Sequence, residues 1–250
     1  MIEQISIDLS NYCSKGCSFC YNSSSAVGST QWMPQEVIDF AVSCIQCGVK
    51  AVSLGGGEPL EYGGIFEIIA ELYPLTYLTL TTNGLPLHQK DIIRRLVVNK
   101  PDKIHISLHN ADDVIEVKRI KEQLDLLKEI AIKPGVNLLV RASNVEACKL
   151  VYREYREILL PEQIILIPQR FVDTPTLKQL ASVAGGERFQ SPSCLLKCAQ
   201  PQSFASISWD KKVNWCSYAK GKRTLETLNY EGMLKALGEV SFSSCGSYCS

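Results

Sequence analysis

The chain contains 250 residues, of which 46% are hydrophobic and 21% are charged, a composition that allows a globular protein with a full core. Basic and acidic residues number 26 each, so the net charge is zero and neither a nucleic acid nor a membrane surface is indicated as a partner. No apolar run is long enough to cross a bilayer, and the first predicted strand begins too close to Met1 to leave room for a signal peptide, so we expect a cytoplasmic protein.

Short β-rich runs alternate with helical stretches over residues 1–184, which predicts an α/β fold with a parallel sheet and covering helices. Pro34 is a favoured first-turn residue, Asn144 is a favoured cap, and Thr174-Pro175 is a typical helix opening. Apolar residues from Ile115 to Ile130 form one stripe of the longest helix. The predicted strands are residues 5–9, 51–54, 77–81, 103–108, 137–141 and 164–167. The predicted helices are residues 34–47, 64–72, 91–98 and 113–130, followed by one capped by Asn144 and one opened by Thr174-Pro175.

Three cysteines follow the first strand in a C-x3-C-x2-C run, Cys13, Cys17 and Cys20, with Phe19 just before the last. Three thiolates on one short loop can bind three irons of a cubane iron–sulfur cluster, which leaves the fourth iron open for chemistry. A disulfide framework is one alternative for a chain with eleven cysteines, but the sequence has no export signal, which a disulfide-bonded secreted protein would need. A zinc site is another, although zinc loops more often pair C-x2-C with a distant second pair.

This cysteine run resembles the signature of the radical S-adenosylmethionine (SAM) superfamily. The resemblance implies that the open iron chelates the amino and carboxylate groups of the methionine part of SAM. It implies that an electron from the 4Fe–4S cluster, supplied by a flavodoxin- or ferredoxin-type reductant, cleaves SAM to methionine and a 5′-deoxyadenosyl radical. The six strand–helix units resemble the partial (β/α)6 TIM-like barrel of the family, in which ligands sit at the C-terminal ends of the strands.

Residues at successive strand ends extend the resemblance. The segment after strand two resembles the family's GGEP motif, which holds the amino group of SAM through backbone oxygens and the glutamate; a glycine-rich turn is the alternative. Strand three ends near Asn83. Alternation along the strand places the side chains of Thr79, Thr81 and Asn83 on one face. The cofactor-binding residues implied by the resemblance are Phe19, Gly56, Gly57, Glu58, Pro59, Asn83, Ser107, Arg141, Leu166 and Pro168.

Four of these residues are assigned from the later strands. Ser107 matches a strand-four serine that contacts SAM, and Arg141 matches a strand-five residue that binds the SAM carboxylate or ribose. Leu166 and Pro168 lie on a strand similar to the one that packs under the adenine, but that strand lacks the glycine of the commoner version.

Alternation along strand four predicts that His105, Ser107 and His109 share the lumenal face. His109 lies at the open end, where it could contact substrate or transfer a proton, or be a structural residue. His105 lies deeper and is expected to be structural. Arg170 is the second candidate catalytic residue.

The βα rhythm stops near residue 185, and a cysteine-rich tail follows. Residues 204–215 read as a β-hairpin with its turn at 210–212, and a helix is predicted over 225–237. This tail resembles the Twitch domain, the shortened relative of the SPASM domain, and implies a second 4Fe–4S cluster. We therefore expect a barrel domain over 1–184 and an auxiliary-cluster domain over 185–250. The implied ligands are Cys198, Cys216, Cys245 and Cys249, with Cys194 as an alternative.

Other interpretations of the tail are a structural zinc site or free thiols, and its final C-x3-C pair departs from the family's frequent C-x2-C. Cys44, Cys47 and Cys148 are expected to be buried helix residues. The basic stretch 220–223 is expected to be a solvated turn.

The resemblance implies an enzyme whose radical abstracts a hydrogen atom from substrate, and a second cluster that accepts an electron would favour net oxidation. The first substrate class is a small natural-product-type metabolite, as in the similar short dehydrogenase of aminocyclitol antibiotic biosynthesis, whose reaction is dehydrogenation or bond formation. The alternative is a maturase that makes thioether links, carbon–carbon crosslinks or epimers in a ribosomal peptide. The chain starts at its first strand, so an N-terminal leader-binding domain is not expected, which favours the small substrate. A glycyl-radical activating enzyme ranks lower, and an electron carrier or zinc-binding module ranks last.

Overall fold

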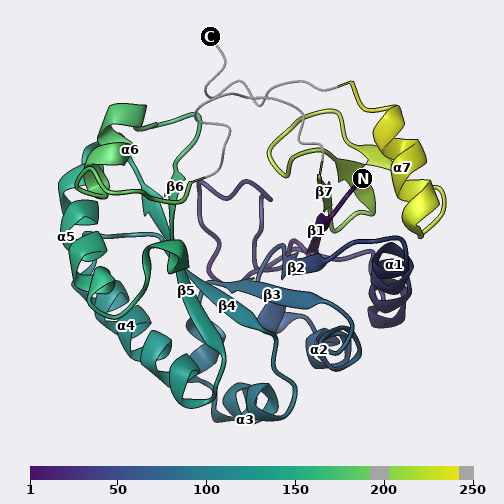
Figure 1. Cartoon of the computed structure of the whole chain (residues 1–250), viewed down its shortest axis with the longest axis horizontal. Coiled ribbons are helices and arrows are strands. Elements are labelled where there is room, and N and C mark those ends of the chain that lie inside the picture. Colours follow the sequence, from purple (N-terminus) through teal and green to yellow (C-terminus); the bar gives the residue numbers. More distant parts are fainter. Residues whose placement is uncertain (192–202, 242–250) are drawn as a thin grey trace. The chain divides into compact units, whose positions relative to one another are not determined.

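The computed structural model describes residues 1–191 and 203–241, and these fall into two compact units. The first unit contains residues 1–102 and 203–241, and the second contains residues 103–191. Each combines parallel strands with helices that follow them in the sequence (Figure 1).

The strands of the first unit lie in the order β3-β2-β1-β7-β8-β9. β1, β2, β3 and β7 are parallel, with Ile5 opposite both Val52 and Ala205, and Val52 opposite Leu78. The hairpin strand β8 runs antiparallel to β7 and to β9. The strand bounds are β1 Gln4–Asp8, β2 Ala51–Gly55, β3 Tyr77–Thr82, β7 Phe204–Ile207, β8 Lys212–Asn214 and β9 Arg223–Thr224.

Alternating side chains build the core of this unit. Ile5 and Ile7 of β1 are fully buried, as are Val52 and Leu54 of β2. Burying each such side chain contributes about 1.5–3 kcal/mol, so the apolar face determines which way each strand points. The helices are α1 Pro34–Gln46, α2 Ile65–Leu72, α3 Lys90–Val98 and α7 Tyr230–Gly238, with 3-10 turns η1 Pro59–Glu61 and η2 Leu85–His88.

The second unit has three parallel strands in the order β6-β5-β4. Ser107 of β4 lies opposite Asn137 of β5, and Leu138 lies opposite Leu166 of β6. The strands are β4 Lys103–Leu108, β5 Lys133–Val140 and β6 Ile164–Pro168. The helices are α4 Val114–Glu129, α5 Val145–Arg156 and α6 Leu177–Val183, with 3-10 turns η3 Ala142–Asn144 and η4 Pro161–Gln163.

The predicted strands and helices are all present, but several bounds differ. β5 begins at Lys133, four residues before the predicted start at residue 137. Pro134 and Gly135 belong to the strand because they pair in parallel with Ile104 and His105 of β4. α6 begins at Leu177 instead of at Thr174-Pro175, because the hydroxyl of Thr176 accepts a hydrogen bond from the backbone N–H of Gln179.

The last helix is also shorter than predicted. α7 begins at Tyr230, five residues after the expected start, because the side chain of Asn229 caps it by accepting from the backbone N–H of Gly232 at 2.8 Å. Leu225 instead continues from β9, with its N–H donating to the carbonyl of Lys211.

Two burial predictions are wrong. Ile115, assigned to the apolar stripe of α4, is 81% exposed because it lies in the first turn, whereas Ile120 is fully buried. Cys47, expected to be a buried helix residue, is exposed because α1 ends at Gln46. Cys44 and Cys148 are buried as predicted, and burial raises the pKa of each thiol to about 12.

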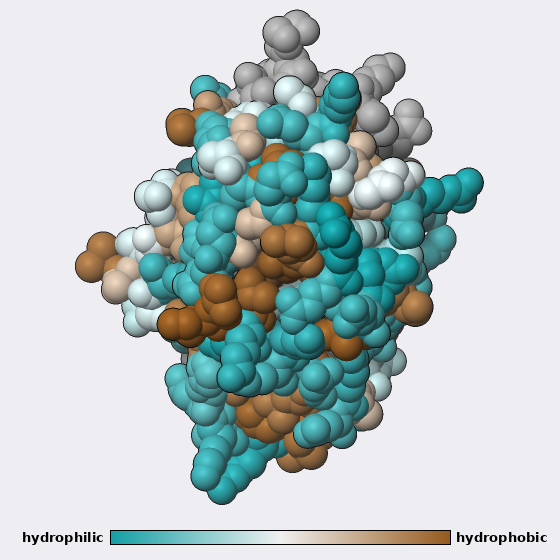
Figure 2. All heavy atoms as spheres, turned by 90° about the vertical axis from the view of Figure 1, so that its left-hand side faces the viewer, coloured by the Kyte–Doolittle hydropathy of each residue, from teal (hydrophilic) through white to brown (hydrophobic). Residues whose placement is uncertain are grey.

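The surface is mostly polar with separate apolar patches on the face shown in Figure 2, which views the left-hand side of Figure 1. Within the two described segments, no helix combines the length and apolar character required to cross a bilayer. Residues 203–241 share a compact unit with residues 1–102, and a separate domain over 185–250 stays a prediction.

Candidate functional site

The three-cysteine loop leaves the C-terminal end of β1 and is held by its own backbone. The N–H of Cys13 donates to the carbonyl of Ser25, and the N–H of Cys20 donates to the carbonyl of Cys17. Gly16 turns the loop with a φ of 56°, a left-handed conformation that glycine adopts without strain. None of the three forms a disulfide within the described part of the chain; Cys13 is buried and the other two are half-buried.

The two glycines of the GGEP segment let the backbone of this segment lie directly against the chain that enters the cysteine loop. A Cβ on Gly57 would lie 1.9 Å from the carbonyl oxygen of Tyr12, and a Cβ on Gly56 would lie 2.6 Å from that of Ser10. The N–H of Gly57 donates to the carbonyl of Ser10 at 2.7 Å, and the N–H of Glu58 donates to that of Tyr12 at 2.9 Å. The glycines therefore fix where the cysteine loop begins.

Glu58 has no exposed surface and accepts hydrogen bonds from three protein donors. One oxygen accepts from the N–H of Leu60 and the hydroxyl of Thr82, and the other accepts from the N–H of Asn83 at 2.7 Å. Burial raises the pKa of Glu58 to about 7, although these hydrogen bonds oppose the shift. A carboxylate has about four acceptor sites, so these three donors leave about one for a further donor.

Asn83 connects the end of β3 to the cysteine loop. Its side-chain nitrogen lies 3.5 Å from the sulfur of Cys13, and its side-chain oxygen accepts from the N–H of Leu85 at 2.8 Å. Asn83 follows the last residue of β3, so strand alternation does not place it. Thr82 and Asn83 are both buried.

The donor set fits an iron–sulfur cluster with three protein ligands. Cysteine thiolates are the ligands that such clusters use, and an N–H donor to a ligating sulfur is a usual feature of their surroundings. Among the described residues, no three His, Cys, Asp or Glu side chains lie close enough to hold one metal ion. A cubane does not require that arrangement, because each thiolate binds a different iron.

Ser107 and Arg141 lie at strand ends of the second unit. Ser107 is half-buried on β4, and Arg141 follows β5. A guanidinium nitrogen of Arg141 donates to the carbonyl of His109 at 2.8 Å and to the side-chain oxygen of Asn110 at 2.7 Å. Buried Glu116 accepts from the N–H of His109 and the side chain of Asn110. Arg141 is thus bound to the segment after β4, and its contact with SAM stays a prediction.

The remaining candidates in this unit differ in exposure. His109 is half-buried, with its Nδ1 4.0 Å from a carboxylate oxygen of Glu116. Arg170 and Pro168 are buried, and Leu166 has no exposed surface. Their assignments to substrate or to SAM stay predictions.

His105 has the surroundings of a structural residue. It is buried, and its Nδ1 lies 2.9 Å from the side-chain oxygen of Asn137. A Cβ on Gly135 would lie 2.6 Å from the ring, so that glycine makes the space for it. Burial lowers the pKa of His105 to about 4, helped by the charge of Lys103, which keeps the ring neutral at pH 7.

Cys216 is the one predicted auxiliary ligand within the described residues, and it is half-buried just after β8. The buried side chain of Asn214 closes its loop by donating to the carbonyl of Lys220 and accepting from the N–H of Trp215. The rings of Tyr218 and Tyr21 pack with centroids 4.9 Å apart. Cys194, Cys198, Cys245 and Cys249 lie outside the described residues.

Two residues that support the loop were not found from sequence. Glu61 of η1 accepts from the N–H and the hydroxyl of Ser14, which follows Cys13. Thr82 donates to Glu58. A threonine and a glutamate carry no local pattern that identifies such roles, because both depend on contacts between segments distant in sequence.

Two relatives are each named Probable GTP 3′,8-cyclase. The protein of Methanocella arvoryzae is 30% identical over 111 residues, which cover 44% of this chain and 36% of the relative. The protein of Methanocaldococcus jannaschii is 24% identical over 176 residues, which cover 66% and 58%. The chain therefore spans only part of the length of these relatives.

Solved structures share the fold. SuiB of Streptococcus suis bound to S-adenosylmethionine matches with a TM-score of 0.68 and 17% identity, covering 90% of this chain and 63% of SuiB. Native anSMEcpe with bound AdoMet matches with a TM-score of 0.63 and 16% identity, covering 95% and 81%. This likeness confirms the predicted α/β class, a TIM-like partial barrel with parallel strands.

The sequence also matches the family profile described as Radical SAM superfamily over residues 7–140. That range is more than half of the chain, and it contains the three-thiol loop, the paired glycines and Asn83. The chain belongs to the radical SAM superfamily of enzymes.

Proposed function

We propose that this chain uses a 4Fe–4S cluster on Cys13, Cys17 and Cys20 to cleave SAM reductively and abstract a hydrogen atom from a substrate. The family binds SAM and a 4Fe–4S cluster, which when bound supply the radical chemistry. The observation that carries the proposal is the direct linkage of the three sequence motifs. The GGEP backbone lies against the entry to the cysteine loop, and Asn83 donates to the sulfur of Cys13.

The residues of the chain have separable tasks in this function. Gly56 and Gly57 set the position of the loop, and Glu58 fixes the end of β3 while keeping about one acceptor site for the SAM amino group. The hydrogen bond from Asn83 to the sulfur of Cys13 tunes the reduction potential of the cluster, because such bonds stabilise its more negative state.

The test is anaerobic reconstitution with iron and sulfide, followed by incubation with SAM and dithionite. We expect 5′-deoxyadenosine from the wild type and none from Cys17→Ala. Cys47→Ala is the matched control, because Cys47 is an exposed cysteine at the end of α1. Equal product from Cys17→Ala and Cys47→Ala would sink the proposal.

We further propose a second 4Fe–4S cluster bound by Cys198, Cys216, Cys245 and Cys249, with Cys194 as the alternative ligand. Support comes from the loop that carries Cys216, which the side chain of Asn214 closes through two hydrogen bonds. Cys216→Ala should lose about one cluster's iron and keep SAM cleavage, whereas Cys47→Ala keeps both. Iron content that is unchanged in Cys216→Ala rules the second cluster out.

The proposed reaction is a net oxidation of a small metabolite, either dehydrogenation or bond formation, with the second cluster accepting an electron. The relatives named as GTP cyclases support a small substrate. Peptide modification is the second candidate, because the similar structures include SuiB bound to precursor peptide SuiA and anSMEcpe bound to the Kp18Cys peptide. Candidate substrates in deuterated form distinguish the two, since deuterium in 5′-deoxyadenosine identifies the compound that lost hydrogen.

A further inference from the structure

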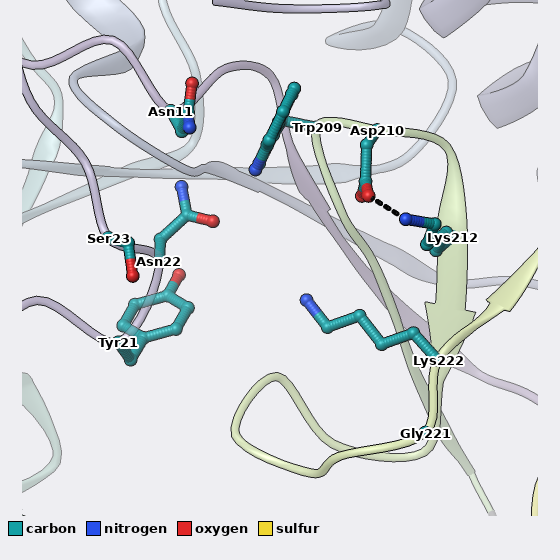
Figure 3. A pocket seen from close by; sticks show the side chains of 9 residues that line it. All are labelled: Asn11, Tyr21, Asn22, Ser23, Trp209, Asp210, Lys212, Gly221 and Lys222. Atoms are coloured by element: carbon teal, nitrogen blue, oxygen red, sulfur yellow. Dashed lines mark hydrogen bonds and ion pairs between the residues drawn. The ribbon is translucent and has the colours of Figure 1, made fainter. Parts of the chain in front are cut away.

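A pocket of about 550 Å³ lies within the first unit, beside the three-cysteine loop (Figure 3). One wall comes from residues that flank the loop, including Asn11 and Tyr21, and Tyr21 directly follows Cys20. The other wall comes from the turn of the hairpin, with Trp209, and from the segment just before β9, with Lys222. The pocket therefore lies between the three-cysteine loop and the hairpin that precedes Cys216.

Lys222 differs from the other lysines of this region. The ammonium of Lys212 lies 2.5 Å from Asp210, and that of Lys211 lies 2.7 Å from Glu36. No hydrogen bond or ion pair engages the ammonium of Lys222 among the described residues, and Figure 3 shows it pointing into the pocket. Asp210, Lys212 and Lys222 are the charged residues that line the pocket. The negative charge of Asp210 neutralises that of Lys212, so Lys222 gives the pocket lining a net charge of about +1.

Further donors face the same space. Figure 3 shows the indole nitrogen of Trp209 and the amide nitrogen of Asn11 turned toward the pocket. The side-chain oxygen of Asn11 already accepts from the N–H of Ser29, which fixes the amide with its nitrogen free to donate. One ammonium and two neutral N–H donors around one space match the acceptor oxygens of a carboxylate or phosphate group.

Asp8 holds the wall of the pocket in place. Its carboxylate is 1% exposed and accepts from the hydroxyl of Tyr21 at 3.1 Å. Burial raises the pKa of Asp8 to about 6, and the charge of Lys222 opposes the rise. Asp8 is thus a positioning residue for Tyr21. It also offers a competing explanation for Lys222, which could serve only to offset the buried carboxylate.

We propose that this pocket binds an oxyanion of the substrate, a carboxylate or a phosphate, through Lys222, with Trp209 and Tyr21 as its flat side walls. The proposal rests on the proposed function, since it identifies a substrate subsite next to the cluster loop. It narrows the substrate class to anionic compounds.

Calorimetric titration of the reconstituted enzyme tests the proposal with matched probes. GTP against guanosine tests the phosphate source, and N-acetylglutamate against N-acetylglutamine tests the carboxylate source. We expect at least one anion to bind more tightly than its neutral partner. Lys222→Met should weaken that binding by about tenfold or more, because it removes a hydrogen bond between two charged groups.

Lys220→Met is the matched control, because Lys220 is exposed, lies two residues away and is absent from the pocket wall. Its dissociation constant for the anion should stay within about twofold of the wild-type value. Binding of the anion beside Trp209 should change the tryptophan fluorescence. If Trp209→Phe loses this change, the bound probe lies at the pocket. The proposal is overturned if neither anion binds, or if both lysine variants bind equally, as expected if Lys222 only offsets Asp8.

Measuring 5′-deoxyadenosine in the same samples separates this proposal from the proposed function. Lys220→Met should still cleave SAM without substrate, because Lys220 lies outside both the three-cysteine loop and the pocket wall. If the wild type binds the anion through Lys222 but makes no 5′-deoxyadenosine, the proposed function fails and the oxyanion site stands. If SAM is cleaved but no anion binds, only the oxyanion site fails.

Discussion

Gly57 shows how closely two backbone segments approach each other beside the cysteine loop. The motif Gly56-Gly57-Glu58-Pro59 could be identified from sequence, but its packing reason could not, because the carbonyl of Tyr12 that fills the space of a Cβ lies 45 positions earlier in the chain. The structure therefore adds a steric role for these glycines to the cofactor-binding role that the resemblance implied.

Gly57→Ala should prevent the cysteine loop from adopting its position. A Cβ 1.9 Å from the carbonyl of Tyr12 forces a backbone shift, and overpacking of this kind costs about 1–3 kcal/mol. We expect lower iron content after reconstitution and a lower urea midpoint. Gly63→Ala is the control, because no heavy atom lies within 4 Å of its Cβ position. Iron loading of Gly57→Ala equal to that of Gly63→Ala would contradict the steric role.

His105 predicts a pH dependence with a definite sign. Its pKa falls from 6.5 to about 4 in the folded protein, so the unfolded chain binds the proton more tightly. The stability that this shift contributes is therefore fully present above pH 6.5, and it is lost as the pH falls toward 4. Between pH 7.5 and 5.5 the loss should be about 1 kcal/mol, measured by urea unfolding.

His105→Gln should lack this part of the pH dependence, whatever its stability at pH 7.5. His88→Gln is the control, because His88 is exposed and should leave the loss unchanged. A wild-type loss that persists fully in His105→Gln would show that other groups cause it.

Local signals located most helices and strands, and they failed where a competing local hydrogen bond or a distant contact decided the structure. Asp113 was expected to open α4, and it does cap that helix. Asn144 was expected to cap α5, but its side-chain oxygen accepts from the N–H of Arg141 instead, an alternative that local spacing also allows. α7 starts late because residue 225 pairs with Lys211 of the hairpin, which no local pattern indicates.

Asp113 allows a test of a single helix. One of its oxygens accepts from the N–H groups of Ile115 at 2.9 Å and Glu116 at 3.2 Å. Asp113→Ala should lower the free energy of unfolding by about 1 kcal/mol, because two N-terminal donors lose their partner. Asp112→Ala, on the exposed neighbour, should change it by less than about 0.5 kcal/mol. Similar urea midpoints for the two variants would argue against the cap.

At the scale of the whole chain, sequence predicted the order of strands and helices but not the pairing of the hairpin. β7 lies beside β1 in parallel, although about 200 residues separate them. Non-local pairing of this kind depends on edges that become available only after the fold forms, so a pattern within one segment does not reveal it. The same limit applied to the pocket, where Lys222 looked like part of a solvated turn.

The division into two compact units predicts how loss of the cluster should spread. The cysteine loop is hydrogen-bonded to the GGEP segment and to the end of β3, all within residues 1–102. Ligand binding stabilises the elements that hold the ligand, and local opening follows cooperative units. Removing the cluster by chelation should therefore raise backbone hydrogen exchange in residues 10–29, 55–59 and 82–85, while residues 103–191 change little.

Hydrogen exchange read by mass spectrometry gives this map directly, with loaded and cluster-free enzyme compared at one pH. Cys47→Ala, which keeps the three loop cysteines, should repeat the wild-type difference. Cys17→Ala should already exchange like the cluster-free enzyme before chelation. An equal rise over residues 103–191 would mean that the cluster stabilises both units, and that the hydrogen bonds within the first unit do not confine its effect.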